Sequence, residues 1–235
     1  MSIVIYDFVP SDHSRQVNLD YYIEKLLMEG RLNDEVQVLD LGCGIGESQK
    51  HFKKINSKIH WVGLDIEDSP EVNSRIETNF EFKSFDGINI PFPDNHFNII
   101  YSKQVFEHVR YPRELLAEVK RVLKPDGYFI GSTSHLEPFH SLSYWNYTPY
   151  GFSQLVEEAD LKISEIRPGI DALTLIIRRG LGSPKIFNIF FRRESPLNLI
   201  ISIVGKIMKL PILNINTIKL LFCGHFVFSV KNRIR

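Results

Sequence analysis

The chain has 235 residues, of which 43% are hydrophobic, so it can bury a large core in one domain, with or without an insertion. No stretch approaches the roughly 18 uninterrupted apolar residues of a membrane span, and the N-terminus lacks a basic, then apolar, then small-residue signal, so we expect a cytoplasmic protein. The two cysteines, Cys43 and Cys223, lie far apart without metal-ligand spacing, which argues against a disulfide framework and a zinc site. We therefore expect no metal.

The net charge of zero conceals an uneven distribution of charge along the chain. Residues 1–170 contain 17 basic and 26 acidic side chains, whereas residues 171–235 contain 11 basic and 2 acidic ones. This asymmetry predicts that the C-terminal part either meets an anionic partner or packs on the acidic part. We do not expect nucleic acid as that partner.

Short apolar or β-branched runs alternate with helix-like segments, which is the pattern of an α/β domain with a largely parallel sheet. The expected strands are residues 36–41, 59–66, 80–85, 97–102, 128–132, 162–166 and 224–231. One helix is expected over residues 112–123, where apolar residues recur at helical spacing, and residues 124–127 should end it in a turn. Another is expected from Pro149, with Thr148 as its cap, to about Ala159.

A glycine loop follows the first expected strand. Gly42, Gly44 and Gly46 allow tight turning and close approach of a ligand. A dinucleotide-binding loop would have a third glycine at the position of Glu47. Asp40, two residues before the loop, would repel a dinucleotide pyrophosphate but suits the ammonium group of a methionine moiety. The loop therefore predicts a cofactor other than a dinucleotide.

Two further aspartates end the next two expected strands. Asp65 can accept hydrogen bonds from both ribose hydroxyls, a feature shared by nucleotide-binding folds in general. Asp86 can accept from an adenine amino group. Each also has a plainer interpretation, as a turn or cap aspartate.

Taken together, these pieces resemble the class I S-adenosylmethionine-dependent methyltransferases over roughly residues 36–170. The matching segments are residues 38–46, 63–66, 86–92, 97–109 and 118–127. The resemblance implies a Rossmann-like fold with helices on both faces of a seven-stranded, mostly parallel sheet whose last strand is antiparallel. It also implies S-adenosylmethionine as cofactor.

The same resemblance implies where the cofactor is held. The loop Gly42, Cys43, Gly44 and Gly46 would cradle the methionine part. Asp65 would bind the ribose, and Ile66, Asp86 and Gly87 the adenine. The backbone near Lys103 and Gln104 would line the sulfonium.

The acceptor is expected at the loop of residues 134–147, because open parallel sheets bind ligands at the carboxyl ends of their strands. Imidazole titrates near neutral pH, so His140 is the first candidate for a general base and His135 the second. Glu137, Tyr144, Trp145 and Tyr147 are candidate acceptor contacts, the aromatics by stacking on a sugar or other flat ring. Structural roles for these histidines and aromatics remain open.

Residues 171–223 interrupt the expected hairpin between the last two strands with about fifty residues, and long insertions are often functional. Within them, residues 196–210 should form a helix with a broad apolar face and with Lys206 and Lys209 on its polar edge. The insertion suits contact with a membrane surface, a lipid-linked or phosphate-bearing substrate or a second subunit, or simple packing on the domain.

The expected organisation is an N-terminal helical or lid segment (1–35), a cofactor-binding core (36–170), a basic and apolar cap (171–223) and a last core strand (224–235). We expect a methyltransferase for a small-molecule or glycan acceptor, by resemblance a sugar hydroxyl or phosphate-type group in surface-polysaccharide biosynthesis. A lipid-like or quinone acceptor is the alternative. A noncatalytic adenosylmethionine-binding module is a further one.

Overall fold

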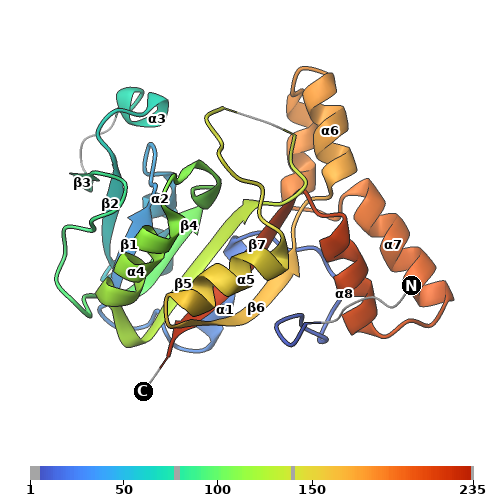
Figure 1. The fold of residues 1–235 in the computed structure, drawn as a ribbon, viewed down its shortest axis with the longest axis horizontal. Helices are drawn as coiled ribbons and strands as arrows, with labels where there is room; N and C mark the ends of the chain where they lie inside the picture. The colour runs from blue at the N-terminus through green and yellow to red at the C-terminus, as the bar shows by residue number, and fades with distance from the viewer. Residues whose placement is uncertain (1–5, 77–79, 139–140, 234–235) are drawn as a thin grey trace.

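The computed structural model describes residues 6–76, 80–138 and 141–233. Its centre is a seven-stranded sheet with the strand order β3-β2-β1-β4-β5-β7-β6, in which β7 runs antiparallel to both of its neighbours (Figure 1). The strands are β1 (Gln37–Leu41), β2 (His60–Ile66), β3 (Glu81–Phe85), β4 (Phe97–Lys103), β5 (Leu123–Ser134), β6 (Leu161–Pro168) and β7 (His225–Asn232). This is the Rossmann-like fold of class I methyltransferases that the sequence predicts.

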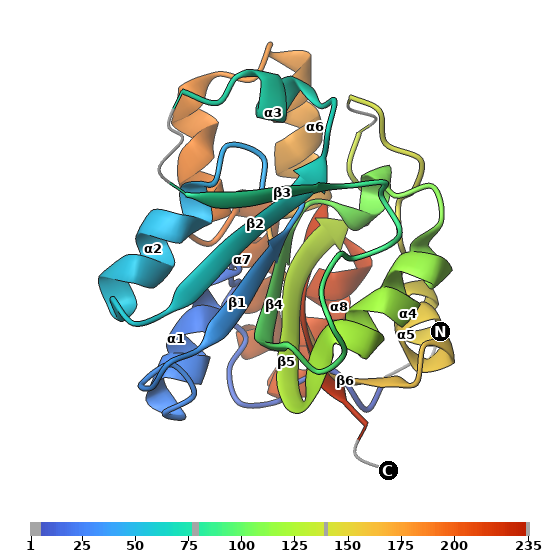
Figure 2. The same ribbon diagram turned by 90° about the vertical axis from the view of Figure 1, so that its left-hand side faces the viewer.

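Helices cover both faces of this sheet. Figure 2 shows α1 (Asp20–Met28) and α2 (Glu47–Ile55) on one side and α4 (Pro112–Val122) and α5 (Pro149–Glu158) on the other. Successive residues of the central strands enter the two cores alternately, so that Val38 joins the α1 and α2 side and Leu39 the α4 and α5 side. Strands buried on both faces need apolar residues at nearly every position, which explains the continuous apolar runs in the sequence.

The predicted helices and strands are found within a few residues of their expected limits, but residues 124–127 differ. They do not form a turn after α4. Instead β5 begins at Leu123, which pairs with Phe97, and a bulge shifts the register before Tyr128 pairs with Ile99. The Pro-Asp-Gly segment is accommodated in this bulge, where extra backbone is tolerated within a ladder.

The insertion forms a separate layer of helices beside β6 and β7. Its elements are α6 (Ala172–Gly180), η2 (Lys185–Phe191), α7 (Pro196–Ile207) and α8 (Ile212–Leu221). An isolated bridge between Asp171 and Cys223 closes its base, so the chain leaves and re-enters the sheet at one point. We call residues 171–223 the cap.

The N-terminal segment connects the cap to the sheet. Gln16 Nε2 donates to the carbonyl oxygens of Phe190 (2.8 Å) and Arg193 (3.0 Å), and Lys219 Nζ donates to Ser14 O (2.6 Å). Further along, the buried guanidinium of Arg167 on β6 pairs with Asp12 at 2.8 Å. The described N-terminal residues are thus packed into the structure between the cap and the β6 edge.

Candidate active site

The glycine loop joins the carboxyl end of β1 to α2. Strand β1 has β2 and β3 on one side and β4 and β5 on the other, so the direction in which successive strands are added reverses at this point. Open α/β sheets bind ligands at such a switch point. Gly42, Gly44 and Gly46 have φ values of +71°, +50° and +81°, a region that favours glycine. A Cβ atom on Gly42 would lie 2.3 Å from Val105 Cγ2, so the side-chain-free loop lies directly against the segment after β4.

Asp40 is buried at the end of β1, 3% exposed, and its carboxylate accepts from Ser48 Oγ. Trp61 Nε1 in turn donates to Ser48 Oγ at 2.8 Å. Burial, with a smaller contribution from the charge of Asp65, raises the pKa of Asp40 to about 7, against the opposing effect of the Ser48 hydrogen bond. An ammonium group placed beside this carboxyl would stabilise its ionised form, so Asp40 fits the role predicted for it.

Asp65 ends β2 and contacts the glycine loop directly. Its Oδ2 accepts from Gly44 N at 2.7 Å and its Oδ1 from Ile66 N at 2.8 Å. Burial raises the pKa of Asp65, partly offset by these two hydrogen bonds. Each carboxylate oxygen has a further lone pair, so ribose hydroxyls can be accepted without loss of the loop contact.

Asp86 forms the turn that follows β3. Its Oδ1 accepts from Ile88 N (2.9 Å) and Asn89 N (2.7 Å), and hydrogen bonds from Asn89 lower the pKa of this exposed carboxyl. Asp86 therefore acts as a turn residue, the plainer of the two roles that the sequence left open for it. Gly87 lies against Ile66, because a Cβ on Gly87 would be 3.7 Å from Ile66 Cγ2. Two of the three residues assigned to the adenine, Ile66 and Gly87, thus meet, and Ile66 is 42% exposed.

Arg75 is a neighbour of the loop that the sequence motifs do not indicate. It follows the short helix α3 (Pro70–Asn73), its Nε donates to Gly44 O at 2.6 Å, and its guanidinium lies 3.9 Å from the centre of the Phe82 ring. It also lowers the pKa of Asp65. Arg75 therefore places a positive charge in contact with a loop that is flanked by two carboxylates.

Lys103 and Gln104 lie at the end of β4, and Lys103 is exposed. Gln104 has a φ of +55° although it is not glycine, and its backbone N–H donates to Ser132 O at 3.0 Å. Strained backbone of this kind is concentrated at functional sites, where surrounding contacts impose it. The segment assigned to the sulfonium is therefore held in one conformation.

A group of polar side chains lies beside Gln104, and we call Gln104, Glu107, Ser134, Glu137 and His225 the acceptor-side cluster. Glu107 is fully buried and accepts from Thr133 Oγ1 at 2.9 Å, while burial raises its pKa. Ser134 Oγ lies 2.5 Å from Glu137 Oε2, which lies 2.7 Å from His225 Nε2. In the amide orientation that satisfies its neighbours, the Gln104 nitrogen lies 2.9 Å from Glu107 Oε1 and 3.2 Å from His225 Nε2.

His225 is the functional candidate that the sequence interpretation missed. It starts β7, and the antiparallel register places it opposite Ser134 at the carboxyl end of β5. It could have been found from the prediction that the last strand is antiparallel. Such a strand places its amino end, and so His225, at the edge of the sheet where the parallel strands have their carboxyl ends. Its side chain is 14% exposed.

The residues predicted for the acceptor loop are divided between several environments. Glu137 is in the acceptor-side cluster, and Arg179 of α6 approaches it at 3.6 Å. His135 is half-buried, and burial lowers its pKa despite a hydrogen bond with the Tyr147 backbone. His140 lies outside the described residues.

The aromatic residues of that loop also differ from one another. The side chains of Tyr144 and Trp145 are exposed. Their backbone N–H groups donate to the backbone oxygen of Glu107, at 2.6 Å and 3.1 Å respectively. Tyr147 must be corrected as an acceptor contact, because it is buried in the core, its hydroxyl donates to Phe106 O at 3.1 Å and its ring contacts Phe152.

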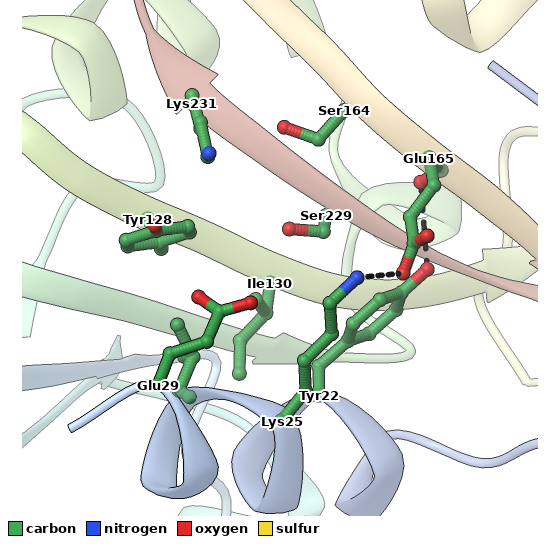
Figure 3. A pocket seen from close by; sticks show the side chains of 10 residues that line it. Tyr22, Lys25, Glu29, Tyr128, Ile130, Ser164, Glu165, Ser229 and Lys231 are labelled. Atoms are coloured by element: carbon green, nitrogen blue, oxygen red, sulfur yellow. Dashed lines mark hydrogen bonds and ion pairs between the residues drawn. The ribbon is translucent and has the colours of Figure 1, made fainter. Parts of the chain in front are cut away.

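A small cavity elsewhere on the sheet is not part of this site. It holds about 100 Å³ between α1 and strands β5, β6 and β7 (Figure 3). Two of its charged groups pair with each other, since Lys25 Nζ lies 3.0 Å from Glu165 Oε1. No residue of the glycine loop or the acceptor-side cluster lines it.

Residues 39–131 match the methyltransferase-domain family. An uncharacterized methyltransferase of Schizosaccharomyces pombe is 33% identical over 104 residues, covering 39% of this chain and 37% of that protein. The sterol 24-C-methyltransferase ERG6B of Gibberella zeae is 32% identical over 101 residues, covering 40% of this chain and 26% of that protein. The chain thus spans well under half the length of these curated relatives.

Solved structures share the fold over more of the chain. A protein assigned as a sarcosine dimethylglycine methyltransferase, from Galdieria sulphuraria, has a TM-score of 0.64 at 16% identity, covering 96% of this chain and 95% of that chain. A SAM-dependent methyltransferase from Aquifex aeolicus has a TM-score of 0.51 at 25% identity, covering 62% and 82%. The chain therefore has the fold of class I methyltransferases, and its residues 39–131 match the methyltransferase-domain family.

Proposed function

We propose that this protein transfers the methyl group of S-adenosylmethionine to an oxygen atom of its acceptor, with His225 as the general base. The observation that carries this proposal is the hydrogen bond of 2.7 Å between His225 Nε2 and Glu137 Oε2, beside Gln104. A hydroxyl acceptor benefits from a base within reach, whereas a neutral amine needs less help.

The residues around the glycine loop fit the cofactor. Asp40 offers a buried carboxyl to the ammonium group, Asp65 keeps acceptor capacity for the ribose, and Ile66 with Gly87 offers an apolar surface to the adenine. When bound, S-adenosylmethionine supplies an electrophilic methyl group on a sulfonium, so the protein's tasks are to position the acceptor, exclude water and remove a proton.

The acceptor-side cluster can remove that proton. In the tautomer that carries the proton on Nε2, His225 donates to Glu137 Oε2 and the Gln104 N–H donates to Glu107 Oε1 instead of to the ring. This fixes the ring orientation and leaves Nδ1 to take the acceptor's proton. Glu137 also stabilises the resulting imidazolium. Glu107 and Ser134 hold Glu137 and Gln104 in place from the buried side.

We propose a sugar hydroxyl of a surface glycan as the acceptor, because Tyr144 and Trp145, whose side chains are exposed, are joined to this cluster by their backbone hydrogen bonds to Glu107 O. A lipid-like or quinone acceptor is the second candidate. One support for it is that α6, which reaches the loop after β5 through Arg179, exposes aliphatic side chains. The other is that the Gibberella zeae relative is named as a sterol methyltransferase.

Calorimetry and methyl incorporation test this proposal. We expect S-adenosylmethionine to bind and NAD not to bind, and labelled methyl to enter a glycan hydroxyl in a panel that also contains sterols, quinones and amines. Binding of NAD at micromolar concentration would overturn the proposal. Cofactor binding without transfer to any acceptor would favour a binding module.

A further inference from the structure

Helix α7 is oriented with its polar residues inward and its aliphatic residues outward. Asn198 is buried and its Nδ2 donates to Gln16 Oε1 (2.7 Å) and Gly169 O (2.9 Å). Gly205 also faces inward, since a Cβ there would lie 2.7 Å from the Ile215 side chain. The outward residues are between 46% and 75% exposed. They are Leu199, Ile200, Ile203, Val204 and Ile207.

The neighbouring cap helices are mixed. In α6, Leu175 is buried together with Thr174, which is bonded to Asp171, but Leu173, Ile176 and Ile177 are exposed. In α8, Ile215 and Leu220 are buried together with Asn216 and Lys219. A helix that packs on its own domain normally turns its apolar face inward, so these outward faces are not explained by the fold of this chain.

All charged residues of the cap that are classed as exposed are basic. Its two acidic residues are both used internally, because Asp171 caps α6 through Thr174 N at 2.7 Å and Glu194 pairs with Lys219. The exposed basic residues are Arg179, Lys185, Arg192, Arg193, Lys206 and Lys209. The apolar face of α7 is thus bordered by basic side chains and by no exposed acid of the cap.

The length of α7 restricts what can cover this face. Its 12 residues measure about 18 Å, against roughly 30 Å for the hydrocarbon core of a bilayer. Among the described residues, no helix has the length and apolarity needed to cross a membrane. A second copy of the chain, packed face to face by a twofold axis, would bring like charges together.

We propose that the outer face of α7 docks on the surface of an anionic lipid bilayer. Its aliphatic side chains would enter the boundary between headgroups and acyl chains, and Lys206 and Lys209 would pair with lipid phosphates. Figure 1 shows α7 on the outer side of the cap, beyond α8 as seen from the sheet, so it can reach a surface without obstruction from the core.

This docking also orients the active site. Arg179 connects α6 to Glu137 of the acceptor-side cluster at 3.6 Å, and α6 contacts α7. The docked helix would therefore be connected through α6 to the acceptor-side cluster. The inference does not depend on which acceptor is methylated.

Vesicle flotation tests the proposal with the full chain. We expect binding to vesicles of phosphatidylglycerol and phosphatidylcholine, at least tenfold weaker binding to phosphatidylcholine alone, and release by salt. The variant Ile200→Glu/Ile203→Glu/Ile207→Glu should lose at least tenfold in binding. Met28→Glu on α1, at a site that is 80% exposed, is the matched control and should bind like the wild type.

Three results would overturn it. They are no flotation with anionic vesicles at low salt, equal binding to neutral vesicles, or a concentration-dependent dimer that the triple variant abolishes without any effect on flotation. Circular dichroism and cofactor calorimetry on each variant show that the fold is intact, so a loss of binding cannot be ascribed to unfolding.

Discussion

His225 Nε2 lies 2.7 Å from Glu137 Oε2, although the two residues are 88 positions apart in the chain. The contact exists because β7 returns antiparallel to β5 and places His225 opposite Ser134. Ser134 precedes Glu137 by only three residues in the chain. It joins a titratable ring to a carboxylate at the edge of the sheet where the cofactor loop also lies.

His225→Gln should reduce kcat on the acceptor by about 10²-fold or more and leave cofactor affinity unchanged, because the proton acceptor is removed and the glycine loop is not touched. Steady-state kinetics and calorimetry separate the two effects. His51→Gln, an exposed histidine on α2, is the control. Wild-type kcat in His225→Gln would eliminate this residue as the base.

Asp65→Ala should weaken S-adenosylmethionine binding by about 1.5 to 3 kcal/mol, roughly 10-fold to 150-fold, since charged hydrogen bonds to the ribose would be lost. Calorimetry measures this directly. Asp68→Ala, three residues further on and exposed, should bind like the wild type. An unchanged Kd for Asp65→Ala would remove Asp65 from the ribose role.

Cofactor affinity should rise as the pH rises through about 7, because the pKa of Asp40 is raised to about 7 in the free protein. Below that pH the carboxyl is neutral and must lose a proton before it can pair with the ammonium group. Affinity should therefore fall by up to about tenfold per pH unit on the acid side and level off on the alkaline side. Asp40→Asn should bind more weakly and show a flat profile, and a flat profile for the wild type would contradict the assignment.

Gly42→Ala should destabilise the protein by about 2 kcal/mol or more, because its φ is +71° and the new Cβ would meet Val105 Cγ2 at 2.3 Å. Denaturant unfolding measures the change. Gly180→Ala, at the end of α6 with no atom within 4 Å of the added carbon, should be neutral or stabilising by up to about 1 kcal/mol. Replacing Val105 by Ala in the Gly42→Ala background should recover part of the loss.

Local sequence patterns were sufficient to predict that the residues assigned to the cofactor lie together. The strand, the glycines and the spacing to Asp65 are all contained within about 30 residues, and parallel strands bring their carboxyl ends to one edge whatever lies between them. The prediction that Gly42, Gly44 and Asp65 lie close together needed no knowledge of distant contacts. The contact of Arg75 with Gly44 O was not predictable in this way, since no motif fixes the direction of the chain after α3.

The acceptor half depended on contacts between distant segments. The aromatic loop suggested Tyr147 as readily as Tyr144, and only the packing around Phe152 and Phe106 assigned Tyr147 to the core. His225 was inconspicuous because a single histidine at a strand end carries no motif.

The cap shows the same division between sequence and tertiary structure. The sequence by itself predicted a helix with one apolar face over residues 196–210, of which the structure forms 196–207, because periodicity depends only on the 3.6-residue turn. It did not determine which face meets the domain. That was decided by the residues that Asn198 and Gly205 contact. Asn198 donates to Gln16 and Gly169, and Gly205 packs against Ile215, and these partners are brought together only in the folded chain.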